Sequence, residues 1–257
     1  MAVVSTLWIL LVLPLTLAFF LQPRRNYSFG NAGDGNEGRT LLLTAHPDDE
    51  TFFFSPTLTA LSHMQNVGRA RDVFVVCLST GNAKGLGDVR KEEFGKALEI
   101  FGIRQGRRFI LDHPYLQDNK TAVWDPAVVA QELRPVVAKY GITTILTFDA
   151  HGITGHPNHF SALAGAAHLV RILPAATRPR LFALHSRPAT KHLGPFAALI
   201  PRRNVSSQGP VFIASLGDFS TALRAMINHP SQLRLVSFLK GLFSRYLWVN
   251  EWVEVAI

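Results

Sequence analysis

Short hydrophobic runs recur along this 257-residue chain, and polar loops or amphipathic stretches separate them. Runs of this length that are rich in leucine and β-forming residues are typical of buried strands. The first four lie over residues 40–45, 72–78, 108–112 and 143–148. Between them, apolar residues at helical spacing predict helices over residues 51–65, 89–101 and 126–140. This alternation predicts an α/β fold with a Rossmann-like, mostly parallel sheet flanked by helices.

The second half of the chain continues the alternation with less regular spacing. The pattern predicts helices and strands over residues 158–173 (helix), 180–184 (strand), 210–216 (strand) and 218–227 (helix). Residues 187–203 are rich in proline, arginine and lysine, which is typical of a solvated loop or of a contact with anionic head groups. Residues 233–255 are apolar with interspersed basic side chains. They predict an amphipathic helix that lies on a membrane or packs on the domain.

The first 22 residues carry no charged side chain and are mostly apolar, which is about the length that crosses a bilayer core. A cleaved signal peptide is the alternative, but no basic segment precedes the apolar run and no small-residue cleavage site follows it. Arg24 and Arg25 follow the run, and this charge bias places the rest of the chain in the cytosol. We therefore expect a membrane anchor over residues 1–25, a linker over 26–38 and one domain over 39–257. The predicted C-terminal helix of that domain, from about residue 231, can associate with the membrane.

Composition narrows the classes of partner and compartment. The formal net charge of +8 favours a negatively charged partner, which is an anionic membrane, a phosphorylated substrate or a nucleic acid. No arginine-rich tract or aromatic-interleaved basic motif supports the nucleic acid. The single cysteine, Cys77, excludes an intramolecular disulfide and is typical of a reducing compartment.

Ionisable side chains cluster directly after the first predicted strand, in the sequence AHPDDE over residues 45–50. Pro47 cannot donate to a sheet ladder and therefore ends the strand, which places these groups where ligands bind in open α/β sheets. The imidazole of His46 and the carboxylate of Asp49 suit zinc or a similar divalent ion. Asp48 can then act as a base on a metal-bound water. The alternative is an acidic helix N-terminus with proline in its first turn, and the two interpretations are compatible.

A second polar cluster follows the fourth predicted strand, over residues 149–159. His156 and His159 are three residues apart and can face one pocket across a helix start. Three histidines, an aspartate and two glycines after a buried strand favour metal binding or catalysis over packing. Together, His46, Asp49 and His159 would provide three protein ligands and leave positions open for water and substrate, as in catalytic zinc sites. No Gly-x-Gly-x-x-Gly motif follows the first strand, so a dinucleotide site is not indicated.

The two motifs, AHPDDE and the later GHPNH over residues 155–159, resemble those of a known enzyme family. This family is the PIG-L or LmbE-like group of zinc-dependent deacetylases, which act on N-acetylglucosaminyl substrates. The resemblance is stronger to its eukaryotic membrane branch, the N-acetylglucosaminyl-phosphatidylinositol de-N-acetylases. It extends over residues 39–57, 141–159 and 229–250.

The resemblance implies a role for each candidate side chain. The metal, zinc, would be held by His46, Asp49 and His159. Asp48 would be the general base, and His156 would stabilise the oxyanion or protonate the leaving amine. Arg90 falls in an Arg-x-x-Glu segment and would contact the sugar or the inositol phosphate. Asn158 stands where many relatives have aspartate, so we assign no catalytic role to position 158.

The reaction implied by the resemblance is metal-dependent hydrolysis of the N-acetyl group of N-acetylglucosaminyl-phosphatidylinositol. It releases acetate early in GPI-anchor biosynthesis. The implied partner is a glycolipid substrate, and the implied location is the endoplasmic reticulum membrane, with a single span and the catalytic domain facing the cytosol. Neither a nucleic acid nor an obligate protein partner is expected. Two alternatives stay open: a deacetylase of a soluble N-acetylglucosaminide, and a catalytically silent membrane-bound binding subunit.

The expected topology makes a prediction about glycosylation. Acceptor sequons begin at Asn26, Asn119 and Asn204, and a lumenal domain would carry glycan on at least one of them. We predict that endoglycosidase treatment of the protein from eukaryotic cells leaves its electrophoretic mobility unchanged. A mobility shift would place the domain in the lumen instead.

Overall fold

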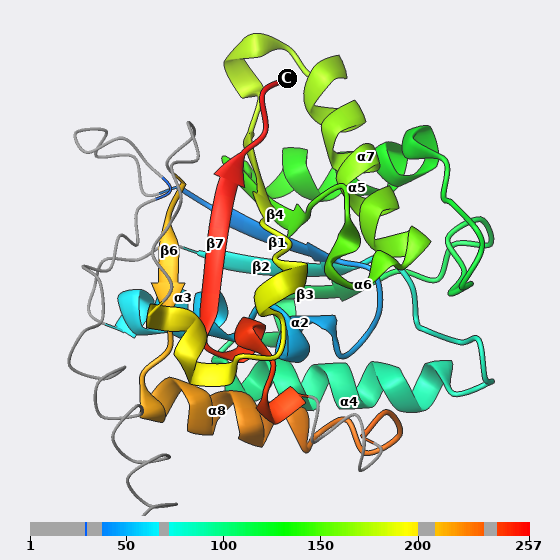
Figure 1. Cartoon of the computed structure of the whole chain (residues 1–257). Helices are drawn as coiled ribbons and strands as arrows, with labels where there is room; N and C mark the ends of the chain where they lie inside the picture. Colours follow the sequence, from blue (N-terminus) through cyan, green and yellow to red (C-terminus); the bar gives the residue numbers. More distant parts are fainter. Residues whose placement is uncertain (1–28, 30–37, 67–71, 200–208, 234–240) are drawn as a thin grey trace, which may run out of the picture.

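The structure, a computed structural model, describes residue 29 and residues 38–66, 72–199, 209–233 and 241–257 (Figure 1). In this part of the chain a seven-stranded sheet has the order β3-β2-β1-β4-β5-β7-β6. The strands are β1 (Thr40–Thr44), β2 (Val73–Cys77), β3 (Arg108–Ile110), β4 (Thr144–Phe148), β5 (Arg180–Leu184), β6 (Val211–Ile213) and β7 (Val249–Glu254). Strands β1 to β5 run parallel, whereas β7 is antiparallel to β5 and β6. The predicted mostly parallel α/β sheet is confirmed.

Helices flank the sheet on both sides (Figure 1). One side carries α3 (Ser55–Asn66), α4 (Gly87–Ile100) and α8 (Leu216–Met226), and the other carries α5 (Pro126–Tyr140) and α7 (Pro157–Ile172). The short helices α2 (Asp49–Phe52) and α6 (Gly152–Gly155) follow β1 and β4. Short 3-10 helices are η1 (Gln105–Arg107), η2 (Ala175–Thr177), η3 (Pro188–Thr190), η4 (Gly194–Leu199) and η5 (Arg245–Leu247).

Burial on both faces of the sheet explains the hydrophobic runs. Every residue of β1, β2 and β4 is buried, and strands covered on both faces need apolar side chains throughout. Thr40 of β1 lies opposite Val73 of β2 and Thr144 of β4, so the three strands begin level. The loops that follow these strands therefore leave from one edge of the sheet. The strand order reverses between β1 and β4, which is the ligand-binding position in folds of this class.

Close packing between α5 and α7 sets where α7 begins. The Asp125 carboxylate accepts a hydrogen bond from the N–H of Ala127 at 2.8 Å and caps α5. At Gly165 of α7, a Cβ atom would lie 2.2 Å from a methyl group of Val129 in α5. Only glycine allows this approach. The contact therefore fixes the depth at which α7 packs, and with it the position of the two histidines at its start.

The predicted helix over residues 51–65 is two helices in the structure. The chain leaves helical geometry at Phe53, between α2 and α3. The two aromatic rings here pack in different directions. Phe54 stacks on Trp252 with ring centroids 5.8 Å apart, whereas Phe53 meets His159 edge-on at 5.7 Å. We attribute the break to the packing of both rings, buried Phe54 and half-buried Phe53, which a continuous helix would turn away from these partners.

The predicted amphipathic helix over residues 233–255 is wrong for residues 249–254, which form β7. Asn250 and Trp252 are two residues apart, are both buried and bond the same residue of α3. The Asn250 amide oxygen accepts from the N–H of Thr57 at 3.2 Å, and the Trp252 indole donates to the Thr57 hydroxyl at 3.0 Å. The backbone of β7 also pairs with a strand on each side. A membrane-associated helix is therefore not found over these residues, because they complete the sheet.

The predicted membrane anchor over residues 1–25 lies outside the described residues. Among the residues that the structure describes, no helix is both long and apolar enough to cross a membrane. Phe29, the described residue of the predicted linker before Gly38, is buried against the rings of Phe182, Phe212 and Trp252. The anchor, the linker and the domain boundaries remain predictions from the sequence.

Candidate active site

The loops after β1 and β4 line one cavity of about 610 Å³ at the carboxyl edge of the parallel strands. His46 and Asn158 are 112 residues apart in sequence, and the parallel pairing of β1 with β4 brings them into contact. The structure places every predicted site residue on the wall of this cavity. These residues are His46, Asp48, Asp49, Arg90, His156 and His159.

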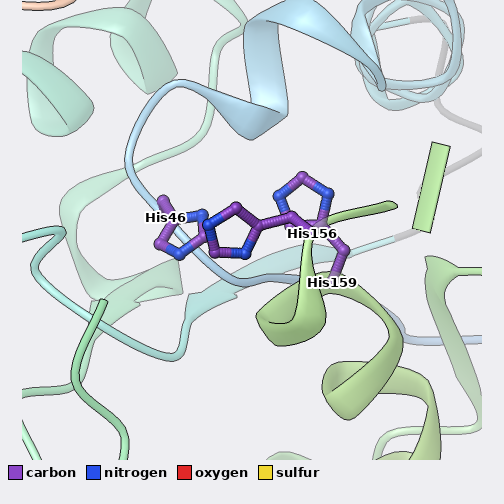
Figure 2. A group of neighbouring side chains, drawn as sticks. All are labelled: His46, His156 and His159. Atoms are coloured by element: carbon purple, nitrogen blue, oxygen red, sulfur yellow. The ribbon is translucent and has the colours of Figure 1, made fainter. Parts of the chain in front are cut away.

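Three imidazoles crowd together in the cavity (Figure 2). His46 comes from the loop after β1, whereas His156 and His159 lie at the start of α7. Each offers a ring nitrogen, and these nitrogens lie within 4.8 Å of one another. His46 and His159 are buried, and His156 is half-buried. Neutral imidazoles are ligands that divalent metal ions such as zinc accept, so these rings are candidate ligands.

Asn158 sets the orientation of the His46 ring. Its amide nitrogen donates to the carbonyl of Ala122 at 2.9 Å, and its amide oxygen accepts from the N–H of Asn119 at 3.2 Å. The same oxygen lies 3.0 Å from Nε2 of His46, so this nitrogen must carry the hydrogen. Nδ1 of His46 is then left as the lone-pair nitrogen. We missed this role in the sequence, because it depends on backbone partners in another loop.

Hydrogen bonds with backbone groups determine which nitrogen carries the hydrogen in the rings of His156 and His159. Nδ1 of His159 lies 2.9 Å from the carbonyl oxygen of Gly152 and must donate to it, so Nε2 is the lone-pair nitrogen whenever this ring is neutral. Nδ1 of His156 accepts from the N–H of Asn158 at 3.2 Å, which leaves the hydrogen on Nε2. His46 and His159 therefore present lone pairs suited to a metal, whereas His156 presents a donor.

Asp49 lies between two of these rings. Its Oδ2 accepts from the backbone N–H groups of Ala45 and His46 at 3.0 and 2.8 Å, and its Oδ1 lies 3.2 Å from Nε2 of His159. Burial would raise the pKa of Asp49, but the charge and hydrogen bond of His159 outweigh it and hold the pKa well below its usual range. Asp49 is therefore an ionised carboxylate fixed beside the lone pairs.

These residues fit a divalent metal ion. Burial lowers the pKa of His46, and burial beside the other two rings lowers that of His156 to about 4, so both rings are neutral. Burial also acts to lower the pKa of His159, but Asp49 outweighs it and raises the pKa. The buried Asp49–His159 contact thus attracts a proton, and a metal bound there would displace it. The predicted ligand set of His46, Asp49 and His159 has the right chemistry and remains a prediction.

Asp48 has a strained backbone and a carboxylate on the cavity wall. Its φ is 109°, which is unfavourable for a residue with a side chain. Glu50 accepts a hydrogen bond from the Asp48 N–H at 3.0 Å and so restrains this peptide. Burial and the nearby Asp49 charge raise the pKa of Asp48 to about 7, although Arg90 opposes the shift. A carboxylate of this pKa can accept and return a proton near neutral pH.

Arg90 is 7% exposed and is engaged by the protein itself. Its guanidinium donates to the carbonyls of Gly81 at 2.8 Å and Pro47 at 2.6 Å. It also lies 3.7 Å from the Asp48 carboxylate and 3.5 Å from that of Asp118. Arg90 therefore ties the loop after β1 to the loop after β2. Its predicted contact with substrate remains a prediction.

A buried pair of Glu50 and His229 lies next to the loop that carries Asp48. Oε1 of Glu50 lies 2.6 Å from Nε2 of His229, and both side chains are fully buried. Burial would lower the pKa of His229, but Glu50 outweighs it and raises the pKa. Nearby, Ser231 donates its N–H to Glu93 of α4 at 2.8 Å. The segment after α8 is thus bonded to Glu50, which accepts the Asp48 N–H, and to α4.

Asp118 and this buried pair were not predicted from the sequence. Asp118 lines the cavity 3.4 Å from Nε2 of His46 and 3.9 Å from Nε2 of His156. It lies in the irregular loop between β3 and α5, where no periodicity or motif singles out a residue. His229 falls in a segment that carries the resemblance, and this was the one available signal for it.

Comparison with known proteins identifies the family. The family model described as "GlcNAc-PI de-N-acetylase" matches residues 41–170, which include both motifs. An N-acetylglucosaminyl-phosphatidylinositol de-N-acetylase from Bos taurus is 32% identical over 219 residues, or 84% of this chain and 83% of the relative. The chain belongs to this family.

The chain is also similar to a second relative in sequence and to a solved structure in fold. A "Probable N-acetylglucosaminyl-phosphatidylinositol de-N-acetylase" from Schizosaccharomyces pombe is 41% identical over 134 residues, and the match spans about half of each protein, 52% in both cases. The fold is similar to that of N,N'-diacetylchitobiose deacetylase from Pyrococcus horikoshii, with a TM-score of 0.61 over 93% of this chain and 92% of that chain. The identity there is 15%, so this likeness shows the fold alone.

The buried pair predicts a large effect on stability. His229→Ala leaves the Glu50 carboxylate buried without its partner, and such a loss typically costs about 3–5 kcal/mol in free energy of unfolding. We expect a loss of this order in denaturant-induced unfolding of the full chain. The matched control is Glu254→Gln, which weakens the exposed pair with Arg180 and should cost about 1 kcal/mol or less. Equal small effects of the two variants would contradict the role given to His229.

Proposed function

We propose that the protein hydrolyses the N-acetyl group of N-acetylglucosaminyl-phosphatidylinositol, which yields glucosaminyl-phosphatidylinositol and acetate. The single observation that carries this is the cavity itself, where Asp48, with a pKa of about 7, lies beside a carboxylate and imidazoles suited to a metal. The names of the relatives in the same family supply the substrate. The reaction is an early step of GPI-anchor biosynthesis.

The proposed cofactor is zinc, held by His46, Asp49 and His159. Nitrogen and carboxylate ligands of this kind suit zinc, and three protein ligands leave room for water and substrate. When bound, the metal supplies Lewis acidity that polarises the acetamide carbonyl and acidifies a water molecule. The protein contributes fixed ligand orientations, because backbone groups and Asn158 hold the rings.

Asp48 and His156 carry the proton steps of the proposal. Asp48 removes a proton from the attacking water, whose oxygen adds to the carbonyl carbon of the acetamide. Nε2–H of His156 donates a hydrogen bond to the oxyanion that forms, because its Nδ1 is occupied by the N–H of Asn158. The carbon–nitrogen bond then breaks, and Asp48 returns its proton to the leaving amine. Because His156 is neutral, it is better suited to donate a hydrogen bond to the oxyanion than to protonate the leaving amine.

Two alternatives to this function differ from it, one in the substrate and the other in whether the protein is catalytically active. A deacetylase of a soluble N-acetylglucosaminide would use the same cavity, but would have no need of the predicted anchor over residues 1–25. A catalytically silent subunit would have no reason to keep a strained Asp48 or the assembled imidazoles. We propose the endoplasmic reticulum membrane as the location, with the catalytic domain facing the cytosol. This part of the proposal rests on the sequence of the first 25 residues.

Acetate release from N-acetylglucosaminyl-phosphatidylinositol tests the proposed reaction. We expect Asp48→Asn to lower kcat by at least about 100-fold, because a general base contributes on the order of 10²–10⁴ in rate. Chelation should abolish the wild-type activity, and added zinc should restore it. The matched control is Asp88→Asn, an exposed aspartate in the first turn of α4, which should retain full activity. Normal activity of Asp48→Asn would remove Asp48 from the mechanism, and an inactive wild type would refute the substrate.

A further inference from the structure

Three lysines line the cavity that holds the candidate active site. Lys84 lies between β2 and α4, Lys120 between β3 and α5, and Lys191 between η3 and η4. Their side chains are exposed or half-buried, so the charges lie toward solvent. Three separate loops therefore bring one cation each to the same hollow.

These lysines differ from the other described lysines in having no partner. Elsewhere, Lys91 pairs with an aspartate at 3.5 Å, Lys96 pairs with a glutamate at 3.9 Å, and Lys139 lies over the Tyr140 ring at 5.2 Å. Among the residues that the structure describes, no ion pair or aromatic contact involves the cavity lysines, which are Lys84, Lys120 and Lys191. The unpartnered lysines of the described chain are thus the ones that line the cavity.

The acidic side chains of the cavity are already committed to other groups. Asp48 and Asp118 both face the Arg90 guanidinium, at 3.7 and 3.5 Å, and Asp49 is held by backbone N–H groups and by His159. Among the described residues, none of these carboxylates forms an ion pair with a lysine of the cavity. Like charges gathered around a concave surface raise the local potential and attract an anion.

Arg90 is not available as the main anion-binding group. Its two terminal nitrogens donate to the carbonyls of Gly81 and Pro47. At Gly81 a Cβ atom would lie 2.3 Å from Nη1 of Arg90, so the guanidinium is packed directly against this loop. A charged group of the substrate would have to meet cations that are free to turn toward it.

We propose that Lys84, Lys120 and Lys191 form a subsite for the phosphodiester of the substrate. The inference rests on the proposed function, in which the head group carries one phosphodiester between inositol and glycerol. A cavity of about 610 Å³ falls in the range that encloses a small-molecule head group, typically about 300–1,000 Å³. The acetamide then lies at the buried histidines and the phosphodiester at the lysines near solvent, on the side from which the lipid chains leave.

A matched pair of water-soluble substrates tests the subsite on the full chain. N-acetylglucosaminyl-glycerophosphoinositol carries the phosphodiester, and N-acetylglucosaminyl-inositol lacks it. The measured quantity is kcat/KM for the compound with the phosphodiester divided by kcat/KM for the compound without it. We expect the combined Lys84→Gln, Lys120→Gln and Lys191→Gln variant to lower this ratio at least tenfold. Added salt should make the difference between variant and wild type smaller. The control is Lys96→Gln, which removes one positive charge from an exposed lysine of α4 that does not line the cavity and should leave the ratio unchanged.

The outcomes separate this subsite from the proposed function. A ratio that stays the same in the triple variant overturns the subsite, and so does a loss that appears only on vesicles containing phosphatidylserine, which would indicate a membrane contact instead. If the wild type hydrolyses neither compound, acetate release from N-acetylglucosaminyl-phosphatidylinositol itself decides the proposed function. Calorimetric titration with glycerophosphoinositol then decides the subsite by itself. Binding at least tenfold weaker in the triple variant than in the wild type supports it, and equal binding or none refutes it.

Discussion

The buried contact between Glu50 and His229 is the interaction on which the candidate site depends. One oxygen of the Glu50 carboxylate meets His229 at 2.6 Å, and the other accepts the N–H of Asp48 at 3.0 Å. The φ of Asp48 is 109°, a conformation that costs on the order of 1–3 kcal/mol and persists only where the surroundings enforce it. Arg90 enforces it from α4 through the carbonyl of Pro47. The segment after α8 and helix α4 thus both hold the loop on which the proposed base is carried.

The charged groups of the cavity change from its buried end, here called the floor, to its solvent-exposed end, the mouth. At the floor, Asp49 and His159 form a buried contact that attracts a proton, and this is the place that a divalent metal would take. Asp48 lies beside it with a pKa raised to about 7, first by burial and then by the Asp49 charge. At the mouth, Lys84, Lys120 and Lys191, which form no ion pair with any residue that the structure describes, provide positive charge near solvent. This gradient suits a substrate whose neutral acetamide enters first and whose anionic group stays outside.

The sequence predicted those features that depend on local patterns. Leucine-rich β1 and the polar residues His46 to Asp49 after it are adjacent, so strand and site could be recognised together. The same holds for β4 and His159. The role of His229 could not be predicted, because its contact with Glu50 joins residues 179 apart and leaves no local pattern. Strand β7 was mistaken for a helix because basic residues interrupt the apolar run before it, and its period of two, from Asn250 to Trp252, is too short to outweigh that pattern.

In the proposed site, His46, Asp49 and His159 hold the metal, while His156 keeps its hydrogen and donates to the oxyanion. Elemental analysis of metal content in purified full-length variants tests this most directly. His156→Ala should retain the metal content of the wild type, because Nε2 of His156 is assigned a hydrogen rather than a lone pair. His159→Ala should lose the metal, since its Nε2 is the lone-pair nitrogen beside Asp49. Loss of metal from His156→Ala to the same extent as from His159→Ala would refute the proposed ligand set and make the three histidines the ligands.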